Sequence, residues 1–131
     1  MIRTVGFFSE LDPGWGLPLH GFMRDSVNPT GEPDEAKIIA YLGNGAAIWS
    51  EMSAGPDVLD PEAPVRTGIG SLYTDGTWLW RQDLSHYLGK YHVSLPQDFV
   101  SHVRSARHQV PEVSERRLTE ILEQDLGLGA D

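Results

Sequence analysis

The sequence predicts an α+β fold: an antiparallel sheet of about four strands, including a hairpin over residues 69–81, with three or four helices packed mainly on one face. Three observations support it. The 131 residues match the size of a single domain, 1–131. Short runs rich in β-branched and aromatic residues lie before residue 82. Segments with helical periodicity lie at 34–45 and after residue 83. The predicted order is strand, loop, helix, strand, hairpin and three helices.

The first third of the chain predicts one strand, one long loop and one helix. Residues 2–8 are β-branched and aromatic, which is typical of a strand. Residues 11–33 hold four Pro and four Gly and predict a long irregular segment tied down by its own side chains. Pro33 suits the first turn of a helix over 34–45. The predicted inner face of this helix is Ala36, Ile39 and Ala40.

The middle of the chain predicts strands separated by an acidic loop. Residues 46–53 alternate in polarity and predict a strand, whereas the Pro-rich residues 54–65 predict a solvated loop. Asp75-Gly76 between two β-rich runs predicts a two-residue type I′ turn that pairs Thr74 with Thr77. In that register one face carries Tyr73, Trp78 and Trp80, and the other carries Leu72 and Leu79.

The last third predicts three short helices, each with a candidate cap. Asp83 is a good N-cap residue, Ser94 and Gln97 have the spacing of a capping box, and Ser114 can cap the last helix. The predicted inner faces are Leu84, Tyr87, Leu88 and Tyr91, then Phe99, Val100, Val103 and Ala106, then Leu118, Ile121 and Leu122 with either Asp125 or Leu126. Residues 127–131 predict a flexible tail.

Composition excludes several classes of protein. The chain has no cysteine, which rules out disulfides, thiol catalysis and iron–sulfur clusters and is in keeping with a cytoplasmic location. Its net charge of −9 argues against nucleic-acid binding and is complementary to a basic protein partner. The N-terminus resembles neither a signal peptide nor a membrane span, so no membrane association is expected.

The sequence shows no catalytic or metal-binding motif, so no catalytic residue, metal or cofactor is predicted. The glycine patterns at 43–45 and 68–70 lack the strand–loop–helix context of a phosphate site. No two of the five histidines are four residues apart, and we expect them to be structural or solvent-facing. His102 is expected to pair with Asp98 on one helix face.

Two hypotheses about function follow. The first is a non-enzymatic acidic binding protein, such as an immunity or inhibitor protein for a basic partner. Its predicted binding residues are Trp15, Trp49, Glu51, Asp57, Asp60 and Glu62. The alternative is a small enzyme or ligand-binding domain with an aromatic pocket between sheet and helices. Its predicted residues are Tyr73, Trp78, Trp80, Asp83, His86 and Tyr87. A homodimer is compatible with either hypothesis.

Residues 74–96 carry the pattern TDGxWxWxxDLxxYxxKYHVxLP. With this pattern the chain resembles small uncharacterised cytoplasmic proteins of high-GC actinobacteria over residues 3 to about 113. The resemblance implies a shared fold and brings no catalytic residue with it. A further analogy, in size and charge, is to the acidic immunity proteins that accompany bacterial toxins.

Overall fold

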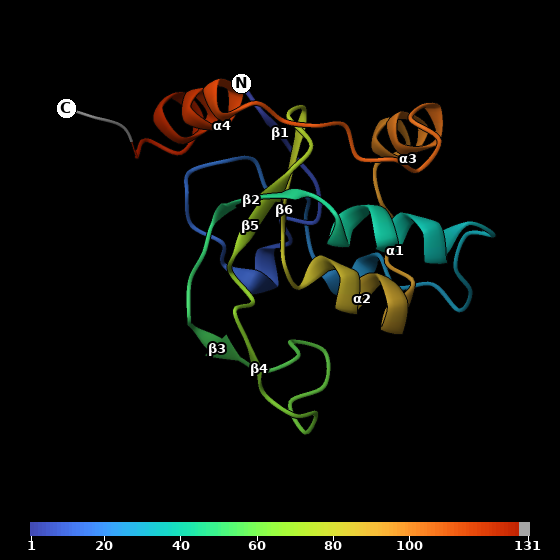
Figure 1. Ribbon diagram of the computed structural model, residues 1–131. Helices are drawn as coiled ribbons and strands as arrows, with labels where there is room; N and C mark the ends of the chain where they lie inside the picture. Colours follow the sequence, from blue (N-terminus) through green and yellow to red (C-terminus); the bar gives the residue numbers. More distant parts are fainter. Residues whose placement is uncertain (129–131) are drawn as a thin grey trace.

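The computed structural model describes residues 1–128, which form an α+β fold (Figure 1). The main sheet has four strands in the order β1-β6-β5-β2, and β3 and β4 form a second, two-stranded sheet. The strands are β1 Arg3–Thr4, β2 Ala46–Trp49, β3 Ala54–Gly55, β4 Arg66–Thr67, β5 Leu72–Thr74 and β6 Trp78–Arg81. The helices are α1 Glu35–Gly43, α2 Leu84–Tyr91, α3 Gln97–Ser105 and α4 Glu115–Glu120. The predicted fold class and the four-stranded sheet are confirmed.

The prediction of a wholly antiparallel sheet is wrong, because β1 runs parallel to β6. A long connection separates these strands, so no hairpin imposes the antiparallel direction. Strand β1 is also shorter than the predicted 2–8. Gly6 adopts a φ of +74°, and a Cβ there would lie 2.6 Å from the Leu84 side chain. The chain therefore bends out of the sheet after Val5, where only glycine fits.

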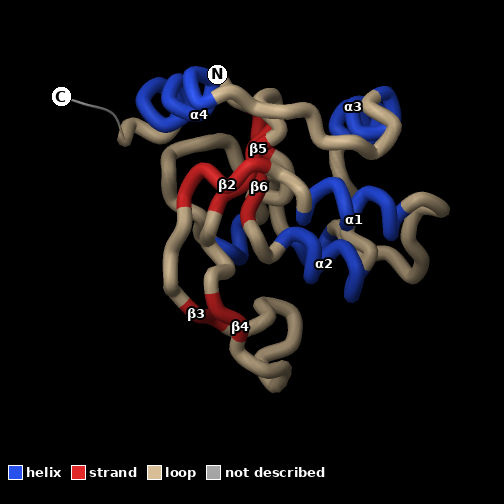
Figure 2. The backbone as a smooth tube through the Cα atoms, in the orientation of Figure 1, coloured by secondary structure: helices blue, strands red, loops and turns tan. Residues whose placement is uncertain are grey.

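Both faces of the sheet are covered, by different elements (Figures 1 and 2). Helices α1, α2 and α3 pack on the face that carries Trp78 and Trp80. The chain after α4 continues as a π-helix, Ile121–Asp125, and packs with the N-terminal segment on the face that carries Leu72 and Leu79. The predicted division of hairpin side chains between the two faces is thus correct.

The hairpin turn differs from the predicted type I′ form. The observed pairs are Leu72 with Arg81, Tyr73 with Trp80 and Thr74 with Leu79, two residues away from the predicted register. Only Gly76 in the turn has positive φ, whereas a type I′ turn needs two such residues. The Asp75 carboxylate accepts the N–H groups of Thr77 and Trp78 and so widens the loop. A slip of two residues keeps every side chain on its face.

Helix α1 turns a different face to the core than predicted. Ile38, Tyr41 and Leu42 are buried, whereas Ala36 and Ala40 are exposed and Ile39 is half-buried. The three buried side chains are also spaced at i, i+3 and i+4, and they remove more apolar surface from water than two alanines do. Larger side chains therefore decide the orientation of this helix.

Two of the three predicted caps do not act as caps. Asp83 precedes α2, but its carboxylate bonds to the Arg81 guanidinium instead of the helix backbone. Helix α3 begins after Pro96, and Ser94 lies outside it, accepting a hydrogen bond from Asn28. Ser114 caps α4 as predicted, accepting the Arg117 N–H.

The remaining predictions concern irregular segments. Residues 11–33 are irregular apart from short 3₁₀ turns, as predicted. The predicted strand 46–53 ends at Trp49, after an irregularity in its pairing with β5, and Met52 is 91% exposed. Most of the predicted tail, residues 129–131, lies outside the described residues.

Candidate functional site

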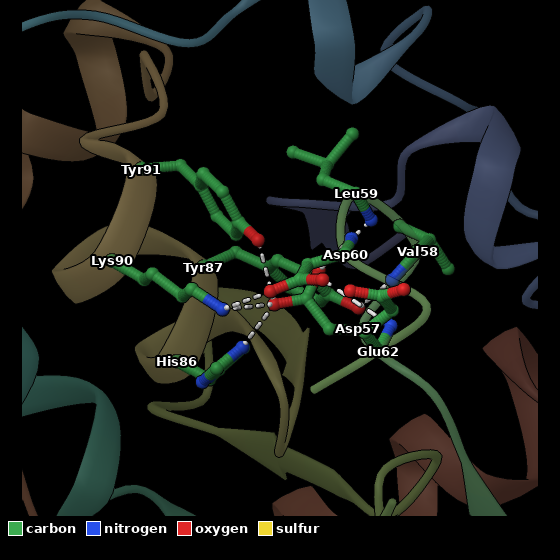
Figure 3. Close-up of polar contacts among 9 residues, drawn as sticks. All are labelled: Asp57, Val58, Leu59, Asp60, Glu62, His86, Tyr87, Lys90 and Tyr91. Carbon is green, nitrogen blue, oxygen red and sulfur yellow. Dashed lines mark hydrogen bonds and ion pairs between the residues drawn. The ribbon is translucent and has the colours of Figure 1, made fainter. Parts of the chain in front are cut away.

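A buried carboxylate, that of Asp57, joins the acidic loop to helix α2 (Figure 3). Its Oδ2 accepts hydrogen bonds from His86 Nε2 at 2.7 Å, from Tyr91 Oη at 2.9 Å and from Lys90 Nζ at 3.3 Å. The same ammonium lies 3.3 Å from Asp60 Oδ2. Residues about thirty positions apart in the sequence thus form one charged network, which we call the Asp57 network.

The backbone of the loop takes part in this network. Asp57 Oδ1 accepts the N–H groups of Leu59 at 2.8 Å and of Asp60 at 3.1 Å, which shapes a tight turn. The Tyr87 hydroxyl accepts the Val58 N–H at 3.0 Å. Side chain and backbone therefore both fasten the loop to α2.

The charges in the network are mutually stabilising. Burial by itself would raise the pKa of Asp57, but hydrogen bonds from His86, the Leu59 N–H, Tyr91 and Lys90 outweigh burial and lower the pKa to about 2. Burial, and then the hydrogen bond to Asp57, raise the pKa of the Tyr91 hydroxyl. Asp57 is consequently a carboxylate at neutral pH and the hydroxyl stays protonated.

The expectation of a solvated acidic loop is therefore wrong for its central residue. The Asp57 side chain is 0% exposed, whereas that of Asp60 is 44% exposed and Glu62 faces solvent. Every hydrogen bond of the Asp57 carboxylate described here goes to the loop itself or to α2. This arrangement can orient His86 and hold the loop, and it leaves Asp57 no free surface for a partner.

A second buried carboxylate, that of Asp75, is bonded in nearly the same way. Its Oδ1 accepts the N–H groups of Thr77 at 2.9 Å and Trp78 at 2.7 Å. Its Oδ2 accepts from Tyr41 Oη at 2.5 Å and from His102 Nε2 at 2.9 Å. We call this the Asp75 network; it ties the hairpin turn to α1 and α3. His102 is thus held by Asp75 and not by Asp98, which pairs with Arg3.

Three of the predicted binding residues meet in another place. Trp15 and Trp49 pack edge to face with ring centroids 5.4 Å apart. Trp15 and Glu51 line a cavity of about 270 Å³ together with Asp12, Ser53 and Arg81. We call this cavity the Trp15 pocket. The predicted partner-binding set therefore divides into this pocket and the loop of the Asp57 network.

The charge of the Trp15 pocket is negative. Arg81 is committed to Asp83, through two hydrogen bonds, and to the Leu11 carbonyl. Within residues 1–128, neither Asp12 nor Glu51 forms an ion pair with a basic side chain. The pocket thus offers two carboxylates without a basic partner beside Trp15, which packs against Trp49.

Trp15 is presented on a strained turn. Its φ is +61°, and Gly14 and Gly16 on either side have φ of +75° and +70°. The Gly16 N–H donates to the Gly14 carbonyl at 2.7 Å, which makes Trp15 the centre of a tight γ-turn of an uncommon form. Such a conformation costs about 1–3 kcal/mol for a bulky residue and is concentrated at functional sites.

The six residues predicted to line an aromatic pocket belong to the core or its border. Phe99 packs edge-on against Trp78 and Trp80, at centroid distances of 5.2 and 6.0 Å, and fills the space between sheet and α3 at that point. The other four are divided among different contacts: Tyr73 borders the core, Asp83 pairs with Arg81, and His86 and Tyr87 contact the acidic loop.

Sequence reasoning missed the importance of Asp75, Tyr41 and His102, and missed the burial of Asp57. One signal was available. In both Asp57-Val-Leu-Asp60 and Asp75-Gly-Thr-Trp78, an Asp precedes a turn in which its side chain can accept the N–H groups two and three positions later. The tyrosine and histidine partners come from other elements and leave no such local pattern.

Searches against models of protein families, curated proteins and solved structures gave no match to this chain. Among residues 1–128, no helix combines the length and apolar character needed to cross a membrane. Nor does that part of the chain gather three or more His, Asp or Glu side chains in a geometry for a metal ion.

Proposed function

We propose that this protein is a non-enzymatic, acidic binding protein, and that it takes an arginine or lysine side chain of a basic protein partner into the Trp15 pocket. An immunity or inhibitor protein is one form of this function. The observation that carries the proposal is the pairing of Trp15 and Trp49 beside two carboxylates without basic partners.

The chemistry of the pocket is complementary to such a side chain. A guanidinium or ammonium group is attracted to the face of an indole ring and bonds well to carboxylates. Tryptophan is enriched among the residues that dominate binding energy in interfaces. The net charge of −9 would also accelerate encounter with a basic partner.

A pull-down from lysate of the source cells tests the proposal. The tagged chain, residues 1–131, is expected to retain a basic partner at low salt and to release it as salt rises. Trp49→Ala and the double variant Asp12→Asn/Glu51→Gln are expected to retain much less of it.

Glu112→Gln/Glu123→Gln is the matched control, because it also removes two negative charges. Both residues are exposed and, within residues 1–128, neither forms an ion pair, so their neutralisation changes the net charge without touching the pocket. Capture that is unchanged in the Trp49→Ala and double variants would remove the pocket from the proposal. A wild-type bait that retains no basic protein would contradict the function itself.

A further inference from the structure

A second and larger cavity lies among the helices, away from the residues of the Trp15 pocket. Its volume is about 450 Å³, within the range of small-molecule sites. The loop 28–32, the start of α1, the end of α2 and the start of α3 surround it. Four buried apolar side chains contribute to its lining: Ile38, Leu88, Val93 and Val100. We call it the His92 pocket.

The polar side of this pocket is a histidine held by a glutamate. His92 Nδ1 lies 2.9 Å from both Glu35 Oε1 and Oε2, and these side chains are 29% and 16% exposed. Donation of the Nδ1 proton to the carboxylate leaves Nε2 as an acceptor. Among residues 1–128, no side chain or backbone group makes a hydrogen bond to Nε2. His92, which lines the pocket, therefore has a ring nitrogen that is free to accept a hydrogen bond.

The backbone conformation at His92 and the absence of a side chain at Gly31 permit the contact between Glu35 and His92. His92 has a left-handed φ of +53° at the end of α2, which is uncommon for a side-chain-bearing residue. Gly31 lies so close to Glu35 that a Cβ at residue 31 would overlap with the carboxylate. Glycine at 31 thus permits the position of the carboxylate beside His92.

Apart from His92, the ionisable side chains that line the pocket are acidic. Its described lining includes Glu32 and Glu35 and contains neither Lys nor Arg. Glu32 shares Arg104 with Asp34, which is the closer partner at 2.9 Å against 3.4 Å. A concave, partly apolar surface with acidic groups concentrates cations over anions.

We propose that the His92 pocket binds a small primary amine with a short apolar tail. The ammonium group would donate to His92 Nε2, while the Glu35 carboxylate holds the imidazole at Nδ1 on the other side of the ring. The tail would contact Ile38, Leu88 and Val100. This inference concerns different residues from the proposed protein-binding function and does not depend on it.

Hexylamine is a suitable probe, used with the ¹⁵N-labelled chain and with amide chemical shifts as the readout. A ligand of this size is expected to bind with a Kd on the order of 1 mM. The amides of Asn28, Gly31, His92 and Ser94 should shift and saturate, whereas that of Gly76 in the hairpin turn should not. 1-Hexanol and hexanoate have the same tail without the positive charge and are expected to bind at least about tenfold more weakly.

Two variants test the residues. Glu35→Gln removes the negative charge of this side chain. Gly31→Ala leaves the Glu35 carboxylate charged but displaces it from its position beside His92. Both are expected to weaken hexylamine binding about fivefold, because the carboxylate that orients the imidazole and attracts the ammonium across the ring is neutralised or moved. Gly43→Ala is the matched control, because a Cβ at residue 43 meets no atom within 4 Å. The amide spectrum of each variant reports directly whether it is folded.

Three outcomes would overturn the proposal. One is the absence of saturable shifts around the pocket at about twentyfold above the expected Kd. Another is equal binding of hexylamine, hexanol and hexanoate to the wild-type protein, a comparison that needs no variant. The third is unchanged affinity in folded Glu35→Gln and Gly31→Ala.

Discussion

The Asp57 and Asp75 networks use the same bonds in two different parts of the molecule. In each, one carboxylate oxygen accepts two backbone N–H groups of its own turn, and the other accepts a tyrosine hydroxyl and a histidine Nε2. The Asp57 carboxylate has a further partner, Lys90. The Asp75 network has no such cation among its described contacts.

The two networks differ in what they connect. All three side-chain partners of Asp57 lie on α2, so this network attaches one loop to one helix. The partners of Asp75 come from α1 and α3, so that network joins the hairpin turn to two helices. The same set of hydrogen bonds therefore fastens a single loop in the Asp57 network, whereas in the Asp75 network it holds three elements together.

Removal of the Asp75 carboxylate should have the largest effect. Asp75→Ala leaves the buried Tyr41 hydroxyl and the Trp78 N–H without their acceptor and is expected to reduce the free energy of unfolding by about 3–5 kcal/mol. Urea denaturation of the wild type and the variant measures this reduction. A loss no larger than that of Asp57→Ala would show that the number of elements joined does not matter.

Asp57→Ala is expected to reduce the free energy of unfolding by about 2–3 kcal/mol. The loss is smaller than for Asp75→Ala because His86 and Lys90 are partly exposed and water can replace the carboxylate as their partner. The change should be local. Hydrogen exchange should accelerate at the amides of Leu59 and Asp60, with the amides of the main sheet unchanged. Acceleration spread evenly over the sheet would contradict the local role.

The pH dependence of stability should separate the wild type from Asp57→Asn. The folded pKa of Asp57, about 2, lies below its usual 3.8, so the carboxylate stabilises the fold above about pH 4, and this contribution is lost as the pH falls towards 2. The contribution of this carboxylate to the free energy of unfolding is on the order of 1–2 kcal/mol, after allowance for solvent screening at His86 and Lys90. The stability difference between wild type and variant, measured by thermal unfolding from pH 7 to pH 2.5, should therefore narrow. A constant difference would contradict the assignment.

A matched pair of hydroxyl deletions compares the networks most finely. Tyr41→Phe removes a buried donor from Asp75 and should reduce the free energy of unfolding by about 1–2 kcal/mol. Tyr91→Phe removes a half-buried donor from Asp57 and should reduce it by about 0.5–1 kcal/mol. Urea denaturation of both variants measures the difference. Equal losses would mean that the burial of the hydroxyl does not set its contribution.

Local sequence determined the elements and their inward faces where apolar spacing was unambiguous. The inner residues Leu84, Tyr87 and Leu88 of α2 and the two faces of the hairpin follow from periodicity, which reports on side-chain direction without knowledge of the rest of the chain. The Ser114 cap followed from a side chain and a backbone group three residues apart.

Tertiary structure alone decided the direction of β1 and the burial of both aspartates. Each depends on partners distant in sequence: β1 on β6, Asp75 on Tyr41 and His102, and Asp57 on His86, Lys90 and Tyr91. An aspartate that reads as a turn residue becomes a buried anchor only when donors from other elements compensate its loss of solvation. Such donors are assembled by the fold, and no local pattern in the sequence records them.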